Sequence, residues 1–237
     1  MGMRKIDKPK PLAKIALDAL RHSILNNELT SDTIYNEKGL AQTLGISRTP
    51  VREALLELSS RRLVRFLPQK GVVVNTFSGK DVEDLFEIRT ALELFAIRKI
   101  CSSLEPVETS FLKQCLTEQK RATGEDDPVA FMEADRKFHI GLTTLANNDY
   151  LLEMMQNIRD IMHLMGFKAL GMNGRMQEVL TEHEDILHAV ENRAVTEAME
   201  KMDLHLDISK TQSKKSNRMR GRIAPGEPAA SQPSQPF

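Results

Sequence analysis

Residues 40–55 have the sequence LAQTLGISRTPVREAL, which decides the fold of the first third of the chain. Their apolar positions can close two crossed helices over one small core, and Gly45 supplies the turn between the helices. We expect these helices at about residues 37–44 and 48–60. This pattern is typical of a helix-turn-helix, whose second helix enters the major groove of DNA. The predicted core positions are Leu40, Ala41, Leu44, Ile46, Val51 and Leu55.

The flanking sequence predicts a third helix and a wing. Residues 12–24 carry apolar side chains at helical spacing, and Pro11 suits a first turn. Residues 63–67 and 72–74 are short β-prone runs on either side of turn residues, a pattern that indicates a hairpin. The N-terminal unit is therefore expected to be a winged helix-turn-helix.

The exposed start of the second motif helix carries groups that suit DNA. Arginine can bridge two acceptors on guanine or grip a phosphate, and hydroxyl groups suit phosphate oxygens. A glycine at the hairpin tip would let the backbone approach the minor groove. Without the helix-turn-helix pattern and the wing, the side chains named below would be interpreted as ordinary solvent-exposed residues. The candidate contacts are Ser47, Arg48, Thr49, Arg52, Lys70 and Gly71.

The net charge of zero hides an asymmetry along the chain. Residues 1–76 sum to +6, residues 77–212 to −10 and residues 213–237 to +4. A basic first part suggests a polyanionic partner. The two cysteines, together with the absence of a secretion signal or a long apolar run, lead us to expect a cytoplasmic protein without a membrane span.

The rest of the chain has a helical pattern, so the predicted fold class is mainly α. We expect about six helices, with starts at Asp127-Pro128 and Asn148-Asp149. The tail is rich in Ser, Pro and Gln, which favours disorder. The predicted organisation is a winged unit (1–76), a linker (77–79), an all-helical bundle (80–212) and a disordered tail (213–237).

Four titratable residues fall on apolar helix faces of the predicted bundle. Asp135 and His139 are one turn apart, a spacing that lets two side chains hold one ion, and His183 and His205 each lie at the centre of an apolar stripe. Each histidine alone is more simply a core residue, but together they suggest a site for a divalent transition metal, zinc or nickel. His22, His163 and His188 have no such company.

An arginine also lies on a predicted apolar face. Arg89 shares its stripe with Val82, Phe86 and Ala96, and a buried guanidinium needs an anionic partner. Glu93, one turn later, could supply that partner. An acidic ligand is the alternative.

At residues 40–55 the sequence resembles the GntR family of bacterial regulators, whose signature it matches nearly residue for residue. The resemblance implies DNA contacts by Lys38, Arg48, Thr49, Arg52 and Gly71. Lys38 stands where the family usually has arginine. Arg62 stands where a glycine often follows the recognition helix.

The helical part resembles the FCD ligand-binding domain of the FadR-like branch, and its helix count resembles the VanR-type subgroup. The similar segments are residues 87–93, 135–139 and 182–187, together with His205. The resemblance implies a metal held by Asp135, His139, His183 and His205, with Arg89 facing the carboxylate of a small organic acid.

We therefore expect a homodimeric transcription regulator, a repressor, that binds a palindromic operator in double-stranded DNA and responds to a small carboxylate effector. One alternative is a metal-dependent hydrolase fused to a DNA-binding domain, because an Asp/His cluster can activate water. A third possibility is a metal that only braces the bundle.

Overall fold

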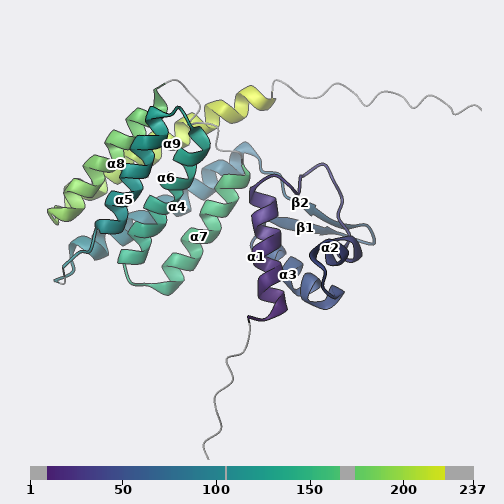
Figure 1. The fold of residues 1–237 in the computed structure, drawn as a ribbon. Helices are drawn as coiled ribbons and strands as arrows, with labels where there is room; N and C mark the ends of the chain where they lie inside the picture. The colour runs from purple at the N-terminus through teal and green to yellow at the C-terminus, as the bar shows by residue number, and fades with distance from the viewer. Residues whose placement is uncertain (1–9, 105, 166–173, 222–237) are drawn as a thin grey trace, which may run out of the picture.

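The computed structural model describes residues 10–104, 106–165 and 174–221, with side chains as far as residue 214. These residues form two bodies that lie side by side (Figure 1). We call them the winged body and the helical body. The elements of the winged body are α1 (Leu12–Leu25), α2 (Glu37–Leu44), α3 (Arg48–Ser60), β1 (Val64–Leu67) and β2 (Gly71–Val74).

The predicted bounds of α2 and α3 are confirmed. Local signals fix both ends of α2. The Asn36 side chain accepts a hydrogen bond from the backbone N–H of Gly39 at 2.7 Å and caps the helix start. Gly45 ends α2 with a φ of 66°, in the left-handed region that glycine occupies without steric cost. The turn of the motif therefore depends on this residue.

The predicted wing is also confirmed. Strands β1 and β2 pair antiparallel, with Val64 opposite Val74, and Tyr35 forms a bridge to Val72. Gly71 has a φ of 134°, and a Cβ there would lie 2.2 Å from the carbonyl oxygen of Tyr35. Glycine is thus required by the packing of the wing itself.

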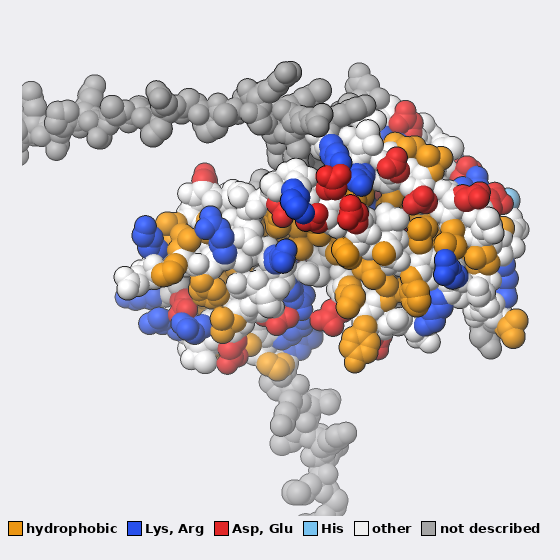
Figure 2. Space-filling view, turned by 180° about the vertical axis from the view of Figure 1, so that it is seen from behind, with side chains coloured by type: hydrophobic (Ala, Val, Ile, Leu, Met, Phe, Trp, Pro, Cys, Tyr) orange, Lys and Arg blue, Asp and Glu red, His pale blue; other side chains and the backbone are white. Residues whose placement is uncertain are grey.

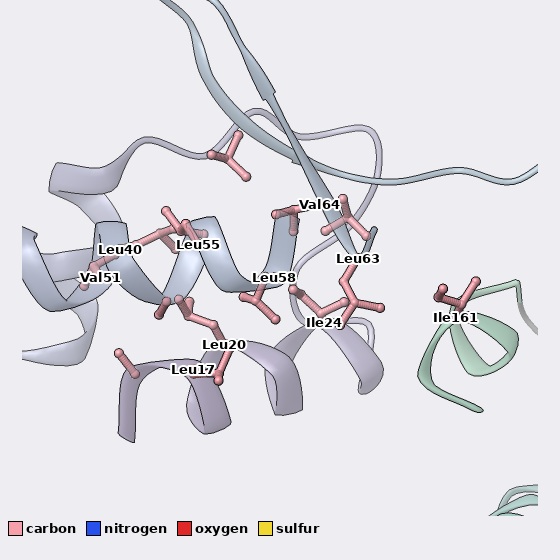
Figure 3. Packing of buried hydrophobic residues seen from close by; sticks show 14 of the residues in the cluster. Leu17, Leu20, Ile24, Leu40, Val51, Leu55, Leu58, Leu63, Val64 and Ile161 are labelled. Atoms are coloured by element: carbon pink, nitrogen blue, oxygen red, sulfur yellow. The ribbon is translucent and has the colours of Figure 1, made fainter. Parts of the chain in front are cut away.

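The core of the winged body extends to the helical body. Figure 3 shows Leu20 and Ile24 of α1 packed near Leu58 of α3, with Leu63 beside them. Ile161 belongs to the same apolar cluster, although it comes from a helix of the other body. The two bodies therefore share a continuous hydrophobic contact.

The helical body packs six described helices into a bundle. Its elements are α4 (Gly79–Cys101), α5 (Ser110–Gly124), α6 (Pro128–Leu145), α7 (Asp149–Leu164), α8 (Arg175–Glu191) and α9 (Val195–Gly221). The predicted starts of α6 and α7 are confirmed. The side chains of Asp127 and Asn148 accept hydrogen bonds from the first turns of these helices. Within the described residues, no helix is both long and apolar enough to cross a membrane.

Helix α9 is longer than the sequence pattern predicts. We expected a disordered tail from residue 213, whereas α9 continues to Gly221. Ser213 is buried, and Lys214 Nζ donates to Glu83 Oε1 of α4 at 2.6 Å. The Lys214–Glu83 ion pair joins this part of α9 to α4, and a local sequence pattern does not reveal such a pair. Residues 222–237 lie outside the described part of the chain.

Candidate metal centre and nucleic-acid interface

Three of the four predicted metal ligands converge in the middle of the helical body. His139 of α6, His183 of α8 and His205 of α9 are all buried, and their candidate ligand atoms lie within 4.8 Å of one another. The Nε2 atoms of His183 and His205 are 3.4 Å apart. Three helices thus direct imidazoles at one point.

The Nδ1 atom of each imidazole is hydrogen-bonded to a side-chain oxygen of another residue. Nδ1 of His139 lies 2.6 Å from Glu93 Oε2, and Nδ1 of His205 lies 2.6 Å from Glu182 Oε2. Gln119 Oε1 lies 2.9 Å from Nδ1 of His183. Because a carboxylate only accepts, Nδ1 of His139 and His205 must donate, which leaves an Nε2 lone pair directed inward when the ring is neutral.

The surroundings favour neutral rings at His139 and His183. Burial lowers the pKa of both imidazoles well below the usual value of 6.5, and Arg89 adds to the shift at His139. Inward lone pairs without protons suit a cation. Two nitrogens about 2.1 Å from one tetrahedral ion lie about 3.4 Å apart, which matches the His183–His205 separation.

Asp135 lies at the edge of this cluster. Its Oδ1 atom is 3.7 Å from Nε2 of His139 and 3.8 Å from Nε2 of His183, while Oδ2 accepts a hydrogen bond from Arg159. Burial opposes ionisation of Asp135, but the Arg159 guanidinium and the other nearby charged groups together outweigh it, so the pKa of this carboxyl is lowered. Asp135 can therefore offer one anionic oxygen to an ion shared with the histidines.

Arg89 is buried and contacts the cluster directly. Its Nε donates to Glu93 Oε1 at 2.6 Å, and Nη2 lies 2.8 Å from Nε2 of His139. Burial lowers the pKa of the guanidinium, and Glu93 opposes that shift. Glu93 therefore supplies the anionic partner that the sequence suggested, and it links Arg89 to His139.

A cavity opens beside the histidines, and much of its lining was missed by sequence reasoning. Arg89 and His205 border it, as do Arg136, Arg159 and Arg175. Arg136 and Arg159 fit no simple apolar stripe, and Arg175 stands at the start of its helix. Arg136 and Arg159 form ion pairs between α6 and α7, which the local pattern does not reveal, whereas the carboxylate partners of Arg175 lie on its own helix. The histidine at residue 163, which we had set aside, also lines this cavity.

The winged body presents the predicted DNA contacts on its surface. Lys38, Ser47, Thr49 and Lys70 are exposed, Gly71 is half-buried, and the side chains of Arg48 and Arg52 are 67% and 62% exposed.

Glu37 forms ion pairs with Arg48 and Arg52, the two arginines at the start of α3. It accepts from Arg48 at 3.2 Å and from Arg52 at 2.9 Å. Its place at the start of the preceding helix gave no hint of this role. Figure 2 shows basic side chains spread over the winged body, whereas acidic ones gather along the upper part of the helical body.

Comparison with protein families agrees with both halves of this architecture. Residues 12–74 match the model of the gntR family of bacterial regulatory proteins, and residues 84–208 match the FCD domain. The chain belongs to the GntR family. It is a DNA-binding transcription regulator with an FCD domain, and its matches are regulators rather than enzymes, so nothing supports the hydrolase alternative.

Relatives and solved structures cover most of the chain. An uncharacterized HTH-type transcriptional regulator of Bacillus subtilis, YdhC, is 27% identical over 80% of this chain and 85% of its own. The gluconate operon transcriptional repressor of Bacillus licheniformis is 29% identical over 71% and 68%.

Two solved structures share the fold. E. coli McbR/YncC superimposes with a TM-score of 0.76 over 88% of this chain and 99% of its own, at 21% identity. A structure described as the metal-free FCD domain of TM0439, a putative transcriptional regulator, covers 61% of this chain and 99% of its own with a TM-score of 0.50 at 18% identity.

Proposed function

We propose that this GntR regulator is a cytoplasmic repressor whose hold on its operator is controlled by a small organic acid bound at a metal centre. The observation that carries the proposal is the cluster of inward-facing Nε2 atoms beside a cavity lined with arginines. Several relatives are named as repressors, including the gluconate operon repressor. The metal is zinc or nickel, held by Asp135, His139, His183 and His205.

Arg89 connects the proposed metal centre to the acid. In the structure its Nη2 atom lies against the same His139 Nε2 lone pair that a metal would use. One lone pair cannot serve both, so Arg89 turns toward the cavity when the site is filled. A guanidinium in that position binds a carboxylate through paired hydrogen bonds.

Contacts between α1 and α7 offer a path from this cavity to the DNA-binding unit. Asp160 of α7 accepts two hydrogen bonds from Arg21 of α1, and His163 Nε2 lies 2.8 Å from the carbonyl oxygen of Leu25. His163 lines the cavity, and Arg136, which lines it too, donates to Asp160 at 3.2 Å. A ligand that moves these side chains shifts the balance between two positions of α1.

A homodimer is part of the proposal, because a two-fold protein matches a palindromic operator. Exposed apolar residues on the adjacent helices α4 and α7 support it. Ile88 and Phe95 are 56% and 49% exposed, and Tyr150 and Met154 are 80% and 55% exposed. Large apolar surfaces of this kind often mark contacts between proteins. Light scattering should give a dimer mass for the native protein and a monomer for Phe95→Glu.

Metal titration of the stripped protein tests the centre. The wild type should bind one zinc or nickel ion per chain, and His183→Gln should weaken binding by about 100-fold or more, since it loses a ligand. His188→Gln is the matched control, because His188 is exposed on the same helix. Equal affinities for the two variants would refute the proposed ligand set.

A further inference from the structure

The groups around the cavity beside the proposed metal centre carry a net positive charge, which a bound divalent ion would raise beyond what one carboxylate can balance. Each guanidinium that borders it is paired with a carboxylate, but Asp160 is shared between Arg136 and Arg21. Arg21 does not line the cavity, but with it this group holds one guanidinium more than carboxylates, and a divalent ion would add two further charges. The groups counted are Arg21, Arg89, Arg136, Arg159 and Arg175 against Glu93, Asp135, Asp160 and Glu182.

Two other acidic residues touch this set from outside. Glu178 reaches Arg175 and Glu133 reaches Arg136, but their side chains are 63% and 51% exposed. Water screens such pairs, so they compensate little of the buried charge. An unbalanced positive charge in a buried site is costly, which makes an anionic ligand with more than one charge the best complement.

Unpaired hydrogen-bonding atoms mark where a second anionic group would bind. Among the described residues, Nε of Arg136 and Nε of Arg159 are buried without an acceptor, and Oε1 of Gln212 is buried without a donor. All three residues line the cavity. The Arg159 side chain is only 8% exposed. Buried donors without partners are rare in folded proteins, so two beside one cavity point to a ligand.

We infer that the effector carries at least two anionic groups, the first beside Arg89 and the metal centre and the second at the Nε–H groups of Arg136 and Arg159. The ligand is thus a dicarboxylate or a larger polycarboxylate. A hydroxyl group on it would satisfy Gln212. This inference rests on the proposed acid-binding function and specifies its ligand class.

The second subsite also has a direct connection to the winged body. Arg136 donates to Asp160, and Asp160 in turn holds Arg21 of α1. A carboxylate at Arg136 competes with Asp160 for this guanidinium. The second anionic group therefore acts on the contact between the two bodies, which a monocarboxylate held at Arg89 alone does not reach.

Length-matched acids test the inference on the full, metal-loaded protein. Calorimetric titrations compare butanoate with succinate and pentanoate with glutarate. The diacid of a pair should bind about 10- to 100-fold more tightly, since it gains charge-assisted hydrogen bonds to buried donors. Monoacids that bind as tightly as their diacids would overturn the inference and leave the proposed function intact. If no acid binds, both are wrong.

A variant locates the second subsite. Arg136→Gln should bring the ratio of diacid to monoacid affinity close to one, whereas Arg121→Gln, an exposed arginine of α5, should keep the wild-type ratio. An unchanged ratio in Arg136→Gln would contradict the assignment. Circular dichroism confirms that each variant is folded, and the wild-type comparison does not depend on either.

Discussion

Replacing Asp160 with asparagine should lower the free energy of unfolding by about 2 kcal/mol. The Asp160 side chain is 1% exposed and accepts hydrogen bonds from Arg21 and Arg136. Removing one member of a buried ion pair typically costs about 3–5 kcal/mol. The two arginine side chains are 28% and 19% exposed, so water recovers part of that cost.

Urea denaturation of the metal-free protein measures this effect. Asp185→Asn is a matched control, because Asp185 pairs with Lys201 and its side chain is 58% exposed. The control should change stability by less than about 0.5 kcal/mol. If Asp160→Asn costs no more than the control, the contact between α1 and α7 does not hold the two bodies together.

Three further predictions concern the wing and the histidines. Arg62 has a φ of 59°, in the left-handed region that is costly for a residue with a Cβ. Arg62→Gly should therefore raise the free energy of unfolding, measured in urea, by about 0.5–1 kcal/mol, and a lower free energy of unfolding would contradict this. Gly71→Ala should lower the melting temperature, because its Cβ would meet the Tyr35 carbonyl; an unchanged value would show that the wing can shift. His139 and His183 have lowered pKa values, so the folded protein binds fewer protons than the unfolded chain and stability should fall as the pH drops below about 6.5. The slope approaches about 1.4 kcal/mol per pH unit per histidine in denaturation of metal-free protein, and a flat profile would be inconsistent with buried neutral rings.

Much of the winged body could be predicted because its signals are local. Gly45 ends one helix, and the apolar spacing on either side of it allows only a narrow range of packings. Gly71 is needed for a different reason from the one that the sequence suggested. We expected it to allow close approach to DNA, whereas the structure shows that it accommodates the backbone of Tyr35. A one-dimensional pattern marks the unusual residue but does not reveal its neighbour.

The candidate metal centre was predictable for a related reason. His183 and His205 interrupt apolar stripes, and Asp135 precedes His139 by one turn, so each stands out within its own helix. The groups that hold these rings do not stand out. Gln119 and Glu182 reach histidines on other helices, and Arg21 pairs with Asp160 from 139 residues away. Such pairs are set by helix packing, which sequence periodicity does not specify.

Operator affinity, measured with and without metal and with and without acid, is the decisive measurement for control of DNA binding by an acid at the metal centre. The operator is first selected from random DNA with the purified full-length protein, and the acid is a diacid that binds in the calorimeter. The acid should weaken operator binding by about tenfold or more in the metal-loaded protein, within the usual range of allosteric coupling, and should have little effect in the stripped protein. An acid effect of equal size without metal, or no acid effect in the loaded protein, would contradict this prediction.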